Sequence, residues 1–384
     1  MTSEYLVLRI RTETLMNRLR FALIMAGGRG TRFWPVSRAH YPKQLLKIIS
    51  RKSLIRETAD RVLPLVGRSN TFVVTVRDHA GAVRRELAVI PKTNYIAEPC
   101  GRNTAPCIGL AALELLKMNS NAVMMVVPAD HWIADVKTFR QTLKAGMALA
   151  AEREVAVTIG IRPNYPETGY GYIVKGKPLP KLNGTFAYRV RGFKEKPVLR
   201  DAVRLLRSGS LWNSGIFIWK VRTILDLLHE FNAPIYDSLH RISRALNQAS
   251  LGKPSAALRR VVEREYKVMP NISVDHAVME QAAAAGRVVT LEGNFGWSDV
   301  GSWAALHQLL PRDSRNNAGV GQWLSVDSQD CLVYSPQRLA VLLGLREAVV
   351  IDTPDALLVG DLKRSQDLRA VVAELEKKGY NHLT

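Results

Sequence analysis

The sequence lacks any apolar run of the roughly 20 residues that a membrane-spanning helix requires. Its N-terminus also lacks the long apolar core of a signal peptide. Cysteine is scarce, because Cys100, Cys107 and Cys331 are the only three, and they show no metal-ligand spacing. An odd number of free thiols is typical of a reducing compartment. We therefore expect a soluble, cytoplasmic protein without a membrane partner.

Negative charge is also in short supply, since 34 acidic residues face 54 Lys and Arg, for a formal net charge of +20. The basic excess is spread along the chain instead of gathered in a tail. Such a field attracts nucleoside triphosphates and sugar phosphates as readily as nucleic acid. No helix-turn-helix, zinc-finger or RNP pattern accompanies the charge. We expect no specific nucleic-acid partner, although a nucleic-acid-binding module remains an alternative.

Apolar runs and helical spacings alternate in the first part of the chain. Residues 21–25, 71–76 and 122–127 are apolar without alternation, as in strands buried on both faces of a parallel sheet. Helical patterns lie between them, and from about residue 155 the rhythm loosens into mixed strands and helices. This predicts an α/β fold with a Rossmann-like mixed, mostly parallel sheet that has helices on both faces.

The length of 384 residues exceeds one ordinary compact core. Residues 1–20 precede the first convincing strand, so we expect a peripheral N-terminal extension, with Met16 as an alternative translation start. Residues 21–310 form the expected large domain. The polar, turn-rich stretch from Pro311 marks a boundary. Residues 311–384 then contain short strand patterns and a closing helix over 365–378, which predict a small β-rich C-terminal domain.

Glycines at positions 27, 28 and 30 follow the first predicted strand. Glycine lets a backbone approach a ligand closely, so that peptide N–H groups can point at phosphate oxygens. The loop is not a Walker A sequence, because no Gly-Lys-Ser/Thr follows, and Phe33 stands where a dinucleotide fingerprint needs its third glycine. A strand-to-helix turn that binds nothing is the structural alternative.

Residues further along this stretch favour a nucleotide site. The series Gly-Gly-x-Gly-Thr-Arg, Trp34-Pro35 and Pro42-Lys43-Gln44 resembles the signature of sugar-1-phosphate nucleotidyltransferases, in the form carried by mannose-1-phosphate guanylyltransferases. At least seven separate motifs over roughly residues 21–380 support this resemblance. It implies transfer of GMP from GTP to α-D-mannose 1-phosphate, with GDP-mannose and pyrophosphate as products.

The stretch Glu98-Pro-Cys-Gly-Arg-Asn-Thr104 resembles the base-recognition segment of the family. Guanine presents two adjacent donors that a carboxylate can accept, while Arg102 or Asn103 can bond O6 and N7. The alternative is a surface ion pair between Glu98 and Arg102, with Thr104 as a helix cap. The resemblance implies a nucleotide-binding set of Ala26, Gly27, Gly28, Gly30, Thr31, Glu98, Arg102, Asn103 and Thr104.

Asp130 ends a predicted strand in Pro-Ala-Asp-His, and Asp299 lies in Gly-Trp-Ser-Asp-Val-Gly. The resemblance implies that these two carboxylates hold Mg²⁺, which prefers hard oxygen ligands completed by water and phosphate. A turn or helix cap is the alternative for a lone Asp. His131 is expected to be structural, because imidazole is a poor ligand for so hard an ion.

Four short stretches resemble the hexose-phosphate half of the family: Glu-Thr-Gly-Tyr-Gly-Tyr, Phe-Lys-Glu-Lys-Pro, Leu-Trp-Asn-Ser-Gly and Ser-Val-Asp-His. A helix N-cap remains an equal alternative for Asp275. The implied sugar-phosphate-binding residues are Gly169, Tyr170, Gly171, Glu195, Asn213 and Asp275. The implied charge-stabilising catalytic residues are Arg29, Arg32, Lys43 and Lys196.

Two rival functions stay open. One is a glucose-1-phosphate thymidylyl- or uridylyltransferase, and the other is a catalytically silent regulatory subunit that binds nucleotide sugar. Longer relatives carry a C-terminal isomerase domain, for which this chain has no room, so we expect one activity. The oligomeric state is not given by the sequence, and a homodimer is an open alternative.

Overall fold

The computed structural model describes residues 19–28, 30–182, 184–248 and 256–384. The expected extension over 1–20, apart from its last two residues, and the catalytic candidate Arg29 lie outside the described residues. The chain forms two compact units. Unit 1 comprises the chain up to Gly27, Ala59–Pro128 and Ile133–Trp297, and unit 2 comprises Gly28–Thr58, Ala129–Trp132 and Ser298–Thr384.

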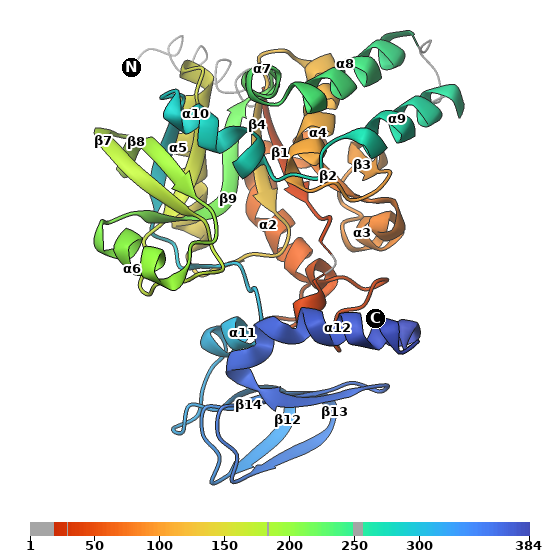
Figure 1. Ribbon diagram of the computed structural model, residues 1–384, viewed down its shortest axis with the longest axis vertical. Coiled ribbons are helices and arrows are strands. Elements are labelled where there is room, and N and C mark those ends of the chain that lie inside the picture. The colour runs from red at the N-terminus through yellow and green to blue at the C-terminus, as the bar shows by residue number, and fades with distance from the viewer. Residues whose placement is uncertain (1–18, 29, 183, 249–255) are drawn as a thin grey trace, which may run out of the picture. The chain divides into compact units, whose positions relative to one another are not determined.

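Unit 1 is built on a nine-stranded sheet with the order β3-β2-β1-β4-β9-β6-β10-β8-β7 (Figure 1). Strands β8 and β9 run antiparallel to their neighbours, and the other seven share one direction. The sheet is therefore mixed and mostly parallel, as the sequence predicts. Its strands are β1 (Arg20–Met25), β2 (Thr71–Val76), β3 (Tyr95–Glu98), β4 (Val123–Pro128), β6 (Ala156–Ile161), β7 (Tyr172–Leu182), β8 (Thr185–Lys194), β9 (Leu211–Lys220) and β10 (Val288–Gly293).

Helices of unit 1 cover both faces of this sheet. Phe217 and Trp219 of β9 belong to the core that includes the helices after β3 and β9. Ile218, between them, faces the other way and contacts Gly146, where an added Cβ would lie 2.6 Å from its Cδ1. The helices are α3 (Ala80–Glu86), α4 (Thr104–Met118), α5 (Val136–Glu152), α6 (Leu199–Arg207), α7 (Val221–Phe231), α8 (Ala233–Gln248), α9 (Ala256–Val268), the π-helix η6 (Asp275–Met279) and α10 (Glu280–Ala284), and α2 (Leu54–Val66) spans the division between the units.

Unit 2 contains a four-stranded sheet with the order β12-β13-β14-β15. Its strands are β12 (Ala318–Val326), β13 (Leu332–Leu343), β14 (Ala348–Asp352) and β15 (Leu357–Asp361), accompanied by α11 (Trp303–Leu309) and α12 (Leu368–Lys377). The glycine-loop segment belongs to the same core. Phe33 is fully buried, and its ring centroid lies 4.9 Å from that of Trp303.

Some predicted elements differ in detail from the structure. The two short strands expected around residues 331–343 are one strand, β13, which pairs in parallel with β12 through its first and second halves. Strand β12 itself was not anticipated, because its side chains alternate irregularly. The closing helix is shorter than expected, since a 3-10 helix (Leu362–Asp367) precedes α12. The boundary expected at residue 311 remains a prediction, because the two units are not consecutive along the chain.

Candidate functional site

The glycine loop leaves β1 and divides between the two units. In unit 1, the N–H of Ala26 donates to Val74 (2.8 Å) and its carbonyl accepts from the Thr75 hydroxyl (2.7 Å). Ala26 is thus anchored to β2 through both backbone groups. Gly27 follows, and a Cβ added to it would lie 3.3 Å from Oε2 of Glu98. The first loop and the predicted base stretch therefore approach each other within unit 1.

Gly30 and Lys43 are packed together in unit 2. Gly30 has a positive φ of 69°, and a Cβ added there would lie 2.3 Å from the Cβ of Lys43. No side chain fits such a space. The Gly30 carbonyl accepts a hydrogen bond from Ser37 Oγ at 2.8 Å. The glycine is required here because the lysine backbone and side chain occupy the adjoining volume.

Lys43 is a buried lysine with two acidic-residue partners, and only 7% of its surface is exposed. Its Nζ donates to Asp130 Oδ2 at 2.7 Å and to the backbone carbonyl of Asp299 at 2.7 Å. It also lies 5.8 Å from the centroid of the Phe33 ring. Three separately predicted residues are thus gathered around one ammonium group in unit 2.

The charge of Asp130 is favoured by this arrangement. Burial acts to raise its pKa, but the charges of Lys43 and His131 outweigh that effect and lower the pKa below its ordinary value. Asp130 is held as a carboxylate, the form that either a metal or a cationic side chain needs.

The fit of this group to a divalent metal follows from its donor set. Among the described residues, no three His, Cys, Asp or Glu side chains are arranged as a metal site. Asp130 and Asp299 could supply two hard oxygens, which suffices for Mg²⁺ when phosphate and water complete the octahedron. The Asp299 carboxylate packs against Gly301, where an added Cβ would lie 2.7 Å from Oδ2. The residues present therefore fit a hard dication bound together with substrate.

Backbone strain marks several predicted motifs. Val300, directly after Asp299, has a φ of 48°, which is an outlier for a β-branched residue. Asn103 in the base stretch (φ 66°) and Lys196 in the sugar stretch (φ 41°) share this left-handed region. Strained residues persist where the surroundings over-determine them, and they cluster at ligand sites. The strain is a signal that the sequence alone does not contain.

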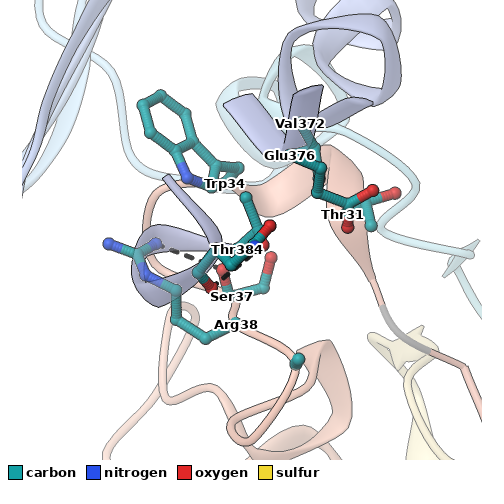
Figure 2. A pocket seen from close by; sticks show the side chains of 9 residues that line it. Thr31, Trp34, Ser37, Arg38, Val372, Glu376 and Thr384 are labelled. Atoms are coloured by element: carbon teal, nitrogen blue, oxygen red, sulfur yellow. Dashed lines mark hydrogen bonds between the residues drawn. The ribbon is translucent and has the colours of Figure 1, made fainter. Parts of the chain in front are cut away.

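Arg32 and Thr31 lie near α12 within unit 2. Arg32 donates to the side chain of Gln366 at 2.8 Å, and burial together with the Arg32 charge lowers the pKa of Arg369. Thr31 lines a cavity of about 220 Å³ that also includes Trp34, Arg38 and Glu376 (Figure 2). These contacts do not place either residue beside Lys43, so their assignment to phosphate remains a prediction.

The base stretch lies at the end of β3 in unit 1. Glu98 is 3% exposed, and its Oε1 accepts a 2.5 Å hydrogen bond from the Tyr266 hydroxyl. Burial raises the pKa of Glu98 to about 7, against the lowering effect of that hydrogen bond. Arg102 donates to the backbone carbonyl of Lys267. Within the described chain, Glu98 and Arg102 form no ion pair with each other, contrary to the alternative interpretation.

The start of α4 is capped by a different residue from the one considered above. Asn103 is the N-cap, and its side chain accepts from the N–H of Thr104 at 2.9 Å. The Thr104 hydroxyl instead accepts from the N–H of Val274 at 2.8 Å. The cap alternative for Thr104 is therefore wrong, because its side chain ties the base stretch to the segment before η6.

Four of the predicted sugar-site residues converge in unit 1. The Asn213 side chain donates to Asp275 Oδ1 at 2.7 Å, and its backbone N–H donates to the Gly171 carbonyl at 2.8 Å. A Cβ added to Gly171 would lie 2.4 Å from Glu195 Oε2. Lys196 donates to the other oxygen of Glu195 at 2.8 Å. Polar groups from strand β9, from the segments just before β7 and just after β8, and from the π-helix η6 thus face one small region.

Asp275 is part of this cluster and not a helix cap. It is the first residue of the π-helix η6, and the structure gives it no capping hydrogen bond. Burial and the neighbouring Glu195 charge raise its pKa to about 6, against the hydrogen bond from Asn213. The N-cap alternative is therefore wrong. A π-helical turn is itself common at functional sites.

The remaining sugar-site candidates lie in other surroundings. The Tyr170 ring contacts the rings of Trp212 and Trp297, each with centroids 5.2 Å away. The N–H of Gly169 donates to the side chain of Glu167 at 2.7 Å. Tyr170 thus belongs to an aromatic group, and Gly169 to a local turn.

The sequence reading missed Tyr266, which contacts Glu98 from 168 positions further along the chain. Tyr266 lies in a helix whose polar pattern resembles that of any surface helix. Its partner is set by tertiary structure alone, so no local signal could have found it.

No helix in the described ranges is long and apolar enough to cross a lipid bilayer.

Comparisons with known proteins identify the family of this chain. A nucleotidyl transferase family model matches residues 21–316, and a model of the mannose-phosphate isomerase/GMP-like β-helix domain matches residues 321–375. The chain is 37% identical to the xanthan biosynthesis protein XanB of Xanthomonas campestris over 94% of its length and 74% of that protein. It is 38% identical to a mannose-1-phosphate guanylyltransferase of Klebsiella pneumoniae, over 92% of this chain and 74% of that one.

A solved structure supports the same grouping. The crystal structure of a mannose-1-phosphate geranyltransferase from Thermus thermophilus superposes with a TM-score of 0.81 at 34% identity. The match covers 93% of this chain and 99% of that one. The C-terminal β-rich region accordingly matches a β-helix domain model over residues 321–375. The chain belongs to the nucleotidyl transferase family, among the mannose-1-phosphate guanylyltransferases.

Proposed function

We propose that the protein transfers GMP from GTP to α-D-mannose 1-phosphate and releases GDP-mannose and pyrophosphate. The observation that carries the proposal is the arrangement around Lys43, which holds one ammonium group against Asp130 and the carbonyl of Asp299. The nucleotidyl transferase family generally uses a divalent metal, and a carboxylate beside a lysine can serve a metal-bound phosphate. A silent regulatory subunit would have no need for a buried, paired lysine of this kind.

The reaction requires no nucleophilic side chain. A phosphate oxygen of mannose 1-phosphate attacks the α-phosphorus of GTP, the bond from that phosphorus to the bridging oxygen breaks, and pyrophosphate leaves with the electron pair. Negative charge therefore grows on the leaving group. We propose that Lys43, Arg32 and Arg29 neutralise that charge in a preorganised way, and that Lys196 meets the sugar phosphate.

We propose Asp130 and Asp299 as the ligands of Mg²⁺. Bound there, the ion would polarise the phosphoryl oxygens and offset charge on the leaving group. The lowered pKa of Asp130 supports this assignment, because the carboxyl group is already ionised at neutral pH and can bind a cation. The backbone of the glycine loop, from Gly27 onward, would direct its N–H groups at phosphate oxygens.

Recognition of the two substrates is proposed for unit 1. Glu98 would accept from N1–H and the 2-amino group of guanine, while Arg102 and Asn103 are candidates for O6 and N7. Asn213, Asp275 and Glu195 would bond the mannose hydroxyls, because each has an oxygen that can accept from them. Their convergence within one unit supports this role.

We place the reaction in the cytoplasm, where thiols remain reduced, because all three cysteines are free in the structure. The oligomeric state, including a homodimer, stays a separate proposal to be tested by light scattering. It does not alter the chemistry above.

The test is an assay of pyrophosphate release with GTP and mannose 1-phosphate, alongside dTTP, UTP and ATP, and with glucose 1-phosphate as the second sugar. We expect GTP with mannose 1-phosphate to be preferred. A preference for dTTP or UTP with glucose 1-phosphate would select the rival transferase. Exchange of labelled pyrophosphate into GTP in the presence of GDP-mannose tests catalysis in the reverse direction, and its absence would favour a regulatory subunit.

A further inference from the structure

The C-terminal end of α9 and the segment after it hold the base stretch at four points. Tyr266 donates to Glu98, and Lys267 accepts from Arg102 through its carbonyl. Ile272 accepts from the N–H of Ala105 at 3.2 Å, and the N–H of Val274 donates to Thr104 at 2.8 Å. Two of the three predicted base-reading side chains, Glu98 and Arg102, are thus held by consecutive residues of one helix.

Of these four contacts, the one from Tyr266 is made directly to the Glu98 side chain. Both side chains are buried, with Tyr266 fully inaccessible to solvent. A buried carboxylate needs hydrogen bonds, and the Tyr266 hydroxyl occupies Oε1. Burial raises the pKa of Tyr266 far above its ordinary range, so the phenol stays protonated and donates to the Glu98 carboxylate. The other oxygen, Oε2, faces the Gly27 side of the loop.

We propose that Tyr266 is a positioning residue for purine selection, which fixes Glu98 so that Oε2 accepts from the guanine edge. The inference rests on the proposed function, because it assumes that Glu98 reads the base. Fixing one oxygen removes the rotation that would otherwise let Glu98 turn away from the base. Selectivity for guanine then depends on a residue that does not touch the nucleotide.

The variant that tests this is Tyr266→Phe, which removes the hydroxyl and keeps the ring in its buried site. Tyr95→Phe is the matched control, because Tyr95 lies in the same strand as Glu98 and its hydroxyl also makes a buried hydrogen bond, at 2.7 Å to the Leu87 carbonyl. The kcat and KM for GTP and for ITP, which lacks the 2-amino group, are measured at saturating mannose 1-phosphate. Thermal stability of both variants is measured in parallel.

We expect Tyr266→Phe to raise the KM for GTP about 10-fold, because Glu98 loses the hydrogen bond that fixes it, while kcat changes little. The ratio of kcat/KM for GTP over ITP should fall, because the contact to the 2-amino group is lost. Tyr95→Phe should leave this ratio unchanged, even if it loses as much thermal stability as Tyr266→Phe does. Equal losses with GTP and ITP, matching those in the control, would overturn the inference.

Glu98→Gln and the double variant Glu98→Gln/Tyr266→Phe separate this inference from the proposed function. If Tyr266 acts through Glu98, the double variant should show no further loss of selectivity beyond Glu98→Gln. A changed ratio in Glu98→Gln with an unchanged one in Tyr266→Phe overturns the inference alone. An unchanged ratio in Glu98→Gln overturns the assignment of Glu98 as the base reader, and the role of Tyr266 with it.

Discussion

Asp130 in unit 2 and Asp275 in unit 1 are both carboxylates at predicted binding motifs, but their surroundings shift their pKa values in opposite directions. Asp130 pairs with the ammonium of Lys43, and its pKa is lowered. Asp275 accepts from a neutral amide and faces Glu195, and its pKa is raised to about 6. Glu98 resembles Asp275, with a phenol as partner and a pKa near 7.

This contrast matches two kinds of task. A group that meets phosphates and a metal must be charged before substrate arrives, and a cation beside it secures that charge. A group that accepts hydrogen bonds from hydroxyl or amino groups has no such need, and a neighbouring cation would compete with the substrate. Because burial outweighs the hydrogen bonds that Asp275 and Glu98 accept, it costs free energy to keep them ionised near neutral pH.

Removing Lys43 should have the largest effect on activity. Lys43→Ala should lower kcat by about 10²–10³, the usual loss for one preorganised donor at developing charge. The defect should persist at high salt, because a contact in the site is not screened as long-range steering is beyond roughly 10 Å at 0.1 M.

The control for Lys43→Ala is Lys377→Ala in α12, where Lys377 is exposed and only 3.9 Å from Glu374. It should behave like wild type at every salt concentration. A Lys43→Ala defect that vanishes in high salt would show that its charge acts only at long range.

Neutralising Asp130 or Asp299 in unit 2 should have the second largest effect on activity. Asp130→Asn and Asp299→Asn should each lose about 10²-fold in turnover at limiting magnesium, because an amide is a poor ligand for a hard dication. Asp130→Asn should also lower the free energy of unfolding by about 1–3 kcal/mol, since Lys43 loses its charged partner. Wild-type activity in either variant at limiting magnesium would remove that residue from the site.

Asp275→Asn should give the opposite result for stability. We expect a rise of about 10-fold in the KM for mannose 1-phosphate, because an acceptor for a hydroxyl is altered. The folded pKa is about 6 and the ordinary value is 3.8, so the wild type loses stability relative to the variant as pH rises from 4 through 6. Above that window Asp275→Asn should be at least as stable as wild type.

Thermal unfolding of both aspartate variants from pH 4 to 8 checks this difference. Asp275→Asn melting well below wild type at pH 8 would contradict it, as would an Asp130→Asn variant that gains stability there. Either outcome would remove the distinction between the two carboxylates.

The smallest effect concerns Glu98 and pH. Between pH 7.5 and 6.5, kcat/KM for GTP should fall about threefold as Glu98 takes up a proton in the free enzyme, because the protonated group accepts less well from guanine. The pH profile of Glu98→Gln should lose this inflection. An inflection that persists near pH 7 in Glu98→Gln belongs to another group.

Much of the sheet could be predicted from the sequence because its strands are buried on both faces. The apolar runs of β1, β2 and β4 carry that signal directly, as their burial confirms. The C-terminal strands were harder to predict, since β12 and β13 are defined by their parallel pairing with each other and not by a local pattern. The ends of these strands are set by pairing between residues that lie too far apart in the chain for a short sequence window to contain both.

The candidate site was predictable residue by residue but not as an arrangement. Motifs identify Lys43, Asp130 and Asp299 separately, and the sequence placed Lys43 with phosphate alone. The structure adds that one lysine contacts both aspartates, across 87 and 256 positions of chain. Tyr266 has no motif, because its contact with Glu98 arises from long-range packing, and the strain at Val300 is not visible in the motif that contains it.

The close approach of Gly30 to Lys43 has a consequence for the history of this chain. A Cβ at position 30 would overlap the Cβ of Lys43, so a side chain there would displace the lysine from its two partners. The clash is with the Cβ and the backbone that any residue except glycine keeps at position 43, so the constraint on position 30 remains when Lys43 is replaced. In lineages that abandon catalysis, position 43 should therefore drift while position 30 stays glycine, and a library that randomises position 30 should recover almost only the parental residue.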